Sequence, residues 1–154
     1  MQTGHAQRLA LVAAVFLAAV AVRADAPDAP LVVAPESLLW TRVPQLAPEI
    51  RAATLVGNPA VAGPYAMRVR LPAGSRIPPH THPDARLVTV LSGEYGLGTD
   101  AAMQSEKLRR LGAGSVVLLP AGVVHYSVAL NGDVEFQESG VGPSGVAFVD
   151  TAAH

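Results

Sequence analysis

Three histidines are the residues of this chain whose types and spacing could do chemistry. His80 and His82 are separated only by Thr81, and His125 follows further along the chain. On a β-strand, residues i and i+2 project from one face about 6.5–7 Å apart, so two imidazoles with this spacing can converge on one point. Neutral imidazole is a common ligand of divalent metals. An isolated pair of this kind is more often structural, so its sequence context decides its interpretation.

Turn-forming residues bracket the histidine pair. Pro78 and Pro79 come directly before it and stiffen the approaching backbone, because the proline ring fixes φ. Gly74 and Gly93 lie on either side and are typical of turns. The pair is therefore predicted to lie in a short, well-defined segment of an all-β chain.

The chain resembles the cupin superfamily in two motifs that together cover residues 74–129. The first motif of that family has the pattern G-x5-H-x-H-x3,4-E-x6-G, and its positions are occupied here by Gly74, His80, His82, Arg86 and Gly93. The second has the pattern G-x5-P-x-G-x2-H-x3-N, and its positions are occupied by Gly114, Pro120, Gly122, His125 and Ala129. The resemblance implies a small double-stranded β-helix barrel with one divalent metal held inside its mouth by His80, His82 and His125.

Two positions depart from the family pattern. Arg86 stands where the family has a glutamate ligand, and Ala129 stands in place of asparagine. An arginine side chain cannot ligate a metal, because it stays protonated and has no lone pair to donate. The implied site therefore has at most three protein ligands. No functional consequence is drawn from Ala129.

Arg86 admits three interpretations. In the first, its guanidinium adds to the positive charge of a metal on three neutral imidazoles, so that the cavity attracts an anion and Arg86 clamps it as a substrate-binding residue. In the second, Arg86 pairs with Asp84 or with Glu94 at the rim, and the site binds metal without chemistry. In the third, Arg86 displaces the metal, and the histidines persist as hydrogen-bonding residues.

The function that the resemblance implies is that of a metal-binding protein, with two alternatives for its activity. Three nitrogen ligands with open positions suit iron, manganese, nickel, zinc and copper. One alternative is an oxidoreductase, dioxygenase-like, that acts on a small anionic molecule. The other is a non-catalytic binding protein for a small ligand or a metal ion. The sequence offers no residue placed as a general base, although Gln137 is a candidate for supporting the metal ligands from a neighbouring strand.

The composition predicts the elements that must position these residues. Thirteen prolines, 14 glycines and a charged fraction of 15% favour short strands and turns over a helical bundle. Strand-sized runs occur at residues 51–56, 65–71, 87–91, 115–119, 123–130, 134–139 and 146–149. Residues 101–108 are the one plausible helix, and Asn131-Gly132-Asp133 is predicted to be a hairpin turn. The expected fold is an all-β double-stranded β-helix, a jelly-roll barrel, over residues 50–150, preceded by a proline-rich arm at 25–49 that Trp40 docks onto the body.

The first residues of the chain are predicted to be a signal peptide. An apolar run at residues 9–22 is too short for a membrane span, which favours a signal peptide over residues 1–24, cleaved after Ala24 or Ala26, rather than an uncleaved anchor. The predicted location is the bacterial periplasm, with no stable membrane span after cleavage.

The net charge and the absence of cysteine limit the classes of ligand and partner that the chain is expected to bind. Cleavage would remove Arg8 and Arg23 and change the net charge from −1 to −3, so no basic surface is available for nucleic acid. The absence of cysteine excludes thiolate ligands. The expected partners are a small, anionic ligand and a second copy of the chain, since residues 87–91 are apolar on both faces of a strand.

Overall fold

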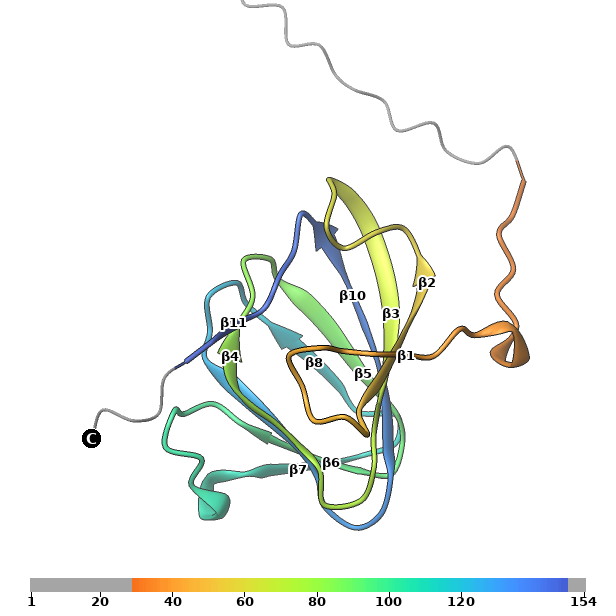
Figure 1. The fold of residues 1–154 in the computed structure, drawn as a ribbon. Helices are drawn as coiled ribbons and strands as arrows, with labels where there is room; N and C mark the ends of the chain where they lie inside the picture. The colour runs from red at the N-terminus through yellow and green to blue at the C-terminus, as the bar shows by residue number, and fades with distance from the viewer. Residues whose placement is uncertain (1–28, 150–154) are drawn as a thin grey trace, which may run out of the picture.

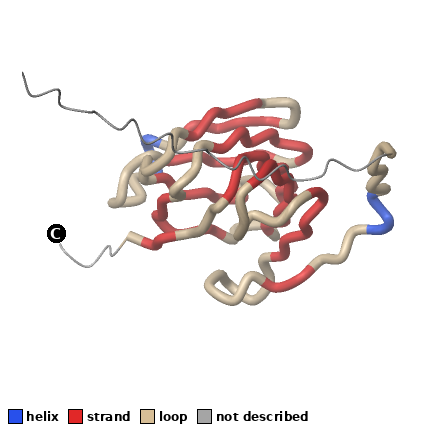
Figure 2. Tube along the Cα trace, turned by 90° about the horizontal axis from the view of Figure 1, so that it is seen from above, coloured by secondary structure: helices blue, strands red, loops and turns tan. Residues whose placement is uncertain are grey.

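Two antiparallel β-sheets face each other and make up the body of the protein (Figure 1). The structure is a computed structural model that describes residues 29–149. The strands in this part of the chain are β1 (Thr41–Arg42), β2 (Arg51–Val56), β3 (Gly63–Leu71), β4 (Arg76–Thr81), β5 (Arg86–Ser92), β6 (Glu94–Gly98), β7 (Arg109–Gly112), β8 (Val116–Leu119), β9 (His125–Ala129), β10 (Val134–Gly142) and β11 (Ala147–Phe148). Two short helical turns, η1 (Pro35–Ser37) and η2 (Ser105–Lys107), lie at the periphery of the body (Figure 2).

The strand order is that of a jelly roll. The first sheet has the order β1-β2-β3-β10-β5-β8, and the second has the order β11-β4-β9-β6-β7. Strands that are neighbours in the sequence, such as β4 and β5, lie in different sheets, so the chain passes repeatedly from one sheet to the other. The all-β fold predicted from the turn-rich composition is confirmed.

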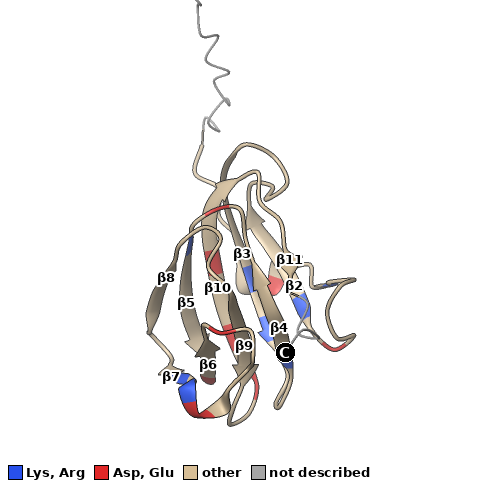
Figure 3. Ribbon diagram, turned by 90° about the vertical axis from the view of Figure 1, so that its left-hand side faces the viewer, with Lys and Arg blue, Asp and Glu red and all other residues tan. Residues whose placement is uncertain are grey.

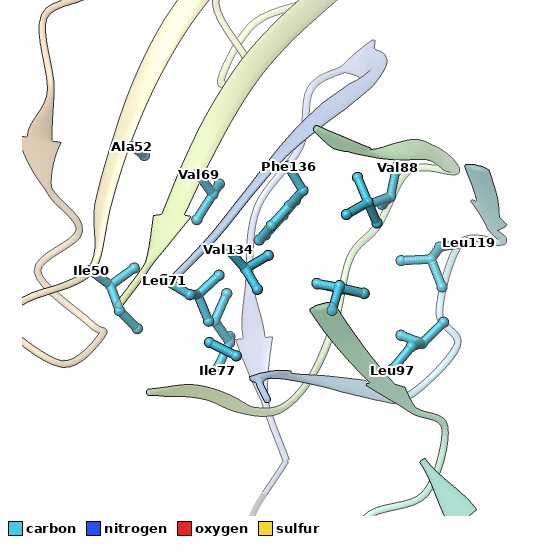
Figure 4. Packing of buried hydrophobic residues seen from close by; sticks show 13 residues of the cluster. Ile50, Ala52, Val69, Leu71, Ile77, Val88, Leu97, Leu119, Val134 and Phe136 are labelled. Atoms are coloured by element: carbon cyan, nitrogen blue, oxygen red, sulfur yellow. The ribbon is translucent and has the colours of Figure 1, made fainter. Parts of the chain in front are cut away.

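The core lies between the inner faces of the two sheets. Alternation along β3 and β10 turns Val69, Leu71, Val134 and Phe136 inward, and each of these is at most 5% exposed. Ile77 and Leu97 meet them from the second sheet (Figure 4). At this end the space between the sheets is filled with apolar side chains, which leaves the other end for the histidines.

The N-terminal arm adds an edge strand to the first sheet. Thr41 pairs with Ala52, and the Trp40 ring stacks under the Arg70 guanidinium at 3.8 Å. The predicted signal peptide, residues 1–24, and the start of the arm lie outside the described residues, so the signal peptide stays a prediction. Between residues 29 and 149 the structure holds no helix long and apolar enough to cross a membrane.

The outer face of β5 and β8 is apolar. Leu87, Leu91, Val116 and Leu118 are between 38% and 66% exposed there, and β8 carries no charged residue (Figure 3). This is the surface on which the sequence predicts a homodimer, and the dimer stays a prediction.

Two local predictions were wrong. The helix expected over residues 101–108 is reduced to the three-residue turn η2. Asn131-Gly132-Asp133 does form a turn, with Gly132 at a φ of 103°, but it joins β9 in one sheet to β10 in the other and makes no hairpin. Turn chemistry describes only the local bend, and the direction of the next strand is decided by packing between the sheets.

Candidate metal centre

The second sheet brings all three histidines to one end of the space between the sheets. His80 lies near the end of β4 and is the register partner of His125 at the start of β9. His82 follows the last residue of β4. The ladder between β4 and β9 is irregular between Ile77 and His80, where Pro78 and Pro79 cannot donate backbone hydrogen bonds. The two prolines therefore end the regular pairing just before the residues that form the site.

The three imidazoles converge. The ring centroids are 4.8 Å apart for His80 and His82, 4.2 Å for His80 and His125, and 5.1 Å for His82 and His125. The nitrogen atoms that could bind a metal all lie within 4.8 Å of one another, and each residue is at most 5% exposed. The structure thus brings together the three histidines predicted from the motifs.

Backbone carbonyls select the tautomer of each ring. His80 Nδ1 donates to the Pro78 carbonyl at 2.7 Å, His82 Nδ1 to the Gly145 carbonyl at 2.6 Å, and His125 Nδ1 to the Val123 carbonyl at 3.0 Å. A carbonyl oxygen only accepts, so the proton of each neutral ring resides on Nδ1 and the lone pair is left on Nε2. Such outer hydrogen bonds are typical of metal-binding histidines, because they fix the ring and raise the basicity of the ligand atom.

The donor set fits a divalent metal. His82 Nε2 is buried and makes no hydrogen bond with any described residue. A buried polar atom without a partner costs about 1–3 kcal/mol, and a metal shared with His80 and His125 would provide that partner. Three imidazole nitrogens suit iron, manganese, nickel, zinc and copper, in agreement with the expected cofactor.

Burial keeps the histidines uncharged. Desolvation is the main cause that lowers the pKa of His80 to about 4, that of His82 to about 3 and that of His125 below its usual range, and the Arg86 charge adds to the effect. Protons therefore compete weakly for these nitrogens near neutral pH, which favours metal binding.

The metal-free protein should lose stability as the pH falls from about 6.5 to about 4. The histidines of the unfolded chain take up protons over this interval, whereas those of the folded protein do not, so acid favours unfolding. Urea unfolding of the chelator-treated protein at several pH values measures the slope of the free energy of unfolding against pH. A variant carrying His80→Gln, His82→Gln and His125→Gln should show a shallower slope, and an equal slope in both proteins would contradict the assigned pKa directions.

Arg86 anchors a buried ion-pair network on the first sheet. Its Nη1 donates to Glu138 Oε2 at 2.7 Å, and its Nη2 bonds Ser144 Oγ and lies 3.5 Å from Asp84 Oδ1. Asp84 in turn accepts hydrogen bonds from Ser144 and from the Tyr65 hydroxyl, the latter at 2.6 Å. The guanidinium side chain is only 6% exposed, so its charge is balanced within the protein.

Two residues considered in the sequence lie elsewhere. Glu94 is not a partner of Arg86, because it pairs with Arg110 at 2.6 Å near the β6–β7 end of the second sheet. Gln137 lies on the outward face of β10 and accepts a hydrogen bond from Arg68 Nε at 3.4 Å. The inward position suggested for Gln137 is occupied by Glu138, since side chains alternate along a strand. The clamp role of Arg86 stays a prediction.

A cavity of about 190 Å³ lies beside the histidines, between the sheets. Its wall is mostly apolar, and the side chains of Gln45, His80, His82, Arg86 and Glu138 add polar groups to it. The lining residues are Val43, Gln45, Leu46, Ala52, Pro59, Met67, Val69, Ile77, His80, His82, Arg86, Glu138, Gly145, Val146 and Phe148. Such a site suits a small, largely apolar ligand that is oriented by a few polar contacts.

Sequence reasoning missed the C-terminal segment and Glu138 as parts of the site. Gly145 orients His82, and β11 lies alongside β4 (Figure 1), with Phe148 paired to His80. A backbone carbonyl leaves no signal in the sequence. Glu138 does have a signal in the sequence. It follows Val134 and Phe136 at alternate positions of one strand, and this apolar alternation predicts that all three side chains face inward.

Comparison with known proteins agrees with the motifs. Residues 67–137 match a family model described as Cupin domain. The polyketide cyclase RemF from Streptomyces resistomycificus has a similar structure, with a TM-score of 0.62 and 19% identity over 77% of this chain and 86% of that one. The DMSP lyase DddQ from Ruegeria pomeroyi DSS-3 has a TM-score of 0.63 and 21% identity over 77% of this chain and 64% of that one.

A third similar structure carries the family name. An RmlC-like cupin from Shewanella frigidimarina has a TM-score of 0.59 and 16% identity over 75% of this chain and 94% of that one. At such identities the likeness concerns the fold alone. No curated protein matches the sequence. The two motifs, the two-sheet fold and the family match agree that the chain carries a small cupin domain, matched over residues 67–137.

Proposed function

We propose that this protein is a metal-dependent cupin in which His80, His82 and His125 hold one divalent metal and a small molecule binds beside it. The observation that supports this proposal best is the state of the three rings. Each Nδ1 is held by a backbone carbonyl, so the Nε2 atoms of all three are available as ligands. Histidines that act only through hydrogen bonds do not require three Nε2 atoms that are held in a fixed orientation and unprotonated.

The charges around the cavity favour an anionic ligand. Three neutral imidazoles would leave the double positive charge of a metal uncompensated. Arg86 contributes one positive charge, and Asp84 and Glu138 contribute two negative ones. The loaded site would therefore carry one surplus positive charge in a buried place, which favours a ligand that binds in its anionic form. The apolar wall matches the remainder of a small organic molecule.

The reaction class that we propose is oxidation of the dioxygenase type. A metal on three protein nitrogens would supply open coordination positions for activating or polarising the bound molecules. The chain itself would contribute the fixed ligand geometry, an apolar wall that excludes water and a buried charged network beside the ligand. These residues orient the ligand between the two sheets.

A non-catalytic binding protein is the second candidate. It is favoured by one observation: both terminal nitrogens of Arg86 already bond to protein groups, so the residue offers fewer donors for a substrate. Such a protein would capture a small ligand or a metal ion without turnover.

Oxygen uptake distinguishes the two candidates. The protein is loaded separately with iron, manganese, nickel, zinc or copper and mixed with a panel of small carboxylates and enols. We expect oxygen consumption with at least one redox-active metal and none with zinc, which has no redox chemistry. Tight ligand binding without oxygen consumption for any metal would contradict the oxidative reaction and favour the binding protein.

A further inference from the structure

Glu138 is a buried carboxylate that metal binding alone does not require. It is 8% exposed, lies on the inward face of β10, and lines the same cavity as His80 and His82. Arg86 Nη1 bonds its Oε2 atom, and no described residue donates a hydrogen bond to Oε1. Buried unpartnered side-chain atoms within residues 29–149 are confined to His82 and Arg86. Oε1 is therefore open to the cavity and free to accept a hydrogen bond from a ligand.

The ion-pair network holds two carboxylates for one guanidinium. Arg86 lies 2.7 Å from Glu138 and 3.5 Å from Asp84, and the side chains of the three residues are between 6% and 11% exposed. The group thus carries one surplus negative charge away from water. A single proton removes this surplus, and Arg86 then still has one carboxylate as its counter-ion.

The surroundings decide which carboxylate takes the proton. Burial raises the pKa of Glu138 against the opposing charge of Arg86. Both oxygens of Asp84 are already occupied by hydroxyl donors. Environments that favour protonation of one carboxylate over the other are typical of an acid–base pair. Glu138 is here the member that changes its protonation.

We propose that Glu138 Oε1 accepts the proton of an acidic O–H group when a ligand binds in this cavity. The ligand class is that of small, largely apolar molecules with such a group, of the catechol or hydroxamate kind. The ligand O–H bond breaks, its electron pair stays on the ligand oxygen, and a new O–H bond forms at Oε1. The ligand becomes a monoanion, Glu138 becomes neutral, and the total charge of the cavity is unchanged. This inference rests on the proposed function, because the anion is balanced by the metal.

Proton counting tests this assignment. Catechol and acetohydroxamic acid, both un-ionised at neutral pH, are titrated into the zinc-loaded protein in weakly buffered solution. The wild type should bind a probe without releasing a proton to the solvent. The Glu138→Gln variant should release one proton per bound probe, because Oε1 is no longer there to accept it. Equal proton release by both proteins would overturn the assignment, and so would a loaded wild type that binds neither probe.

Glu135→Gln is the matched control. Glu135 lies on the outward face of the same strand and pairs with Arg68 and Arg70. Its variant should behave as the wild type in proton release and in probe affinity. A change as large as that of Glu138→Gln would show that the effect is not specific to the cavity, which contradicts the proposal.

A second measurement uses only the wild type and so does not depend on whether Glu138→Gln folds. The infrared difference spectrum between the free and probe-bound zinc-loaded protein should show the gain of a protonated carboxyl band, and its absence would overturn the proposal. Failure of the wild type to take up metal would refute the proposed function, and the role of Glu138 would fall with it. A loaded protein that binds a probe and releases its proton to the solvent would refute the role of Glu138 alone.

Discussion

Replacing Arg86 by methionine should lower the free energy of unfolding of the metal-free protein by about 3–5 kcal/mol, because removal of one partner leaves a buried charge uncompensated. Glu138 would lose the hydrogen bond from Nη1, and Asp84 would lose its nearby cation. Two carboxylates would then remain in a place with little access to water. Urea unfolding followed by tryptophan fluorescence measures the change, since Trp40 is the single tryptophan.

The double variant Arg86→Met and Glu138→Met is the control for this prediction. Replacing a buried ion pair by apolar side chains of similar size is often neutral or stabilising, so the second substitution should recover most of the loss. Asp84 keeps its hydrogen bonds from Tyr65 and Ser144 in both variants. A single variant within about 1 kcal/mol of the wild type would contradict the buried pairing, because that value is typical of exposed ion pairs.

Replacing His82 by asparagine should weaken metal binding by at least about 100-fold, since loss of a supporting residue alone costs 10–100-fold. His82 Nε2 is buried and has no hydrogen-bond partner among residues 29–149, so the substitution would remove one of the three proposed ligands. Competition with a chromogenic chelator measures the affinity.

Gln137→Ala provides the matched control for the His82 variant. Gln137 faces outward on β10 and bonds Arg68, so its removal should leave the metal affinity unchanged. Equal affinities for the His82→Asn variant and the wild type would show that His82 is not a ligand.

The three converging histidines could be predicted from the sequence, because the resemblance of two motifs to those of cupins implies that they lie together. His80 and His82 are two residues apart, and the second motif includes His125 in the strand-sized run at residues 123–130. Arg86 lies an even number of residues after His80 and His82, and the structure buries its side chain as well.

The partners of Arg86 could not be predicted in the same way. Glu138 lies on β10, whose register with β5 sets Gly140 opposite Arg86. That register depends on how two distant strands pair, which no short sequence pattern records. Gly140 itself allows the close approach, since a Cβ atom there would lie 2.6 Å from Asp84 Oδ2 and 2.7 Å from the Tyr65 hydroxyl. The Gly145 carbonyl that orients His82 is equally invisible, because any residue has one.

Elemental analysis of the purified wild-type protein is the most direct test of the metal centre. The protein is isolated without added metal or chelator, and its metal content is compared with that of a variant in which His80, His82 and His125 are all replaced by glutamine. The proposed function predicts about one divalent metal per wild-type chain, from one shared site, and almost none in the variant. A wild type that is metal-free as isolated and cannot be loaded with iron, manganese, nickel, zinc or copper would contradict the metal-dependent function.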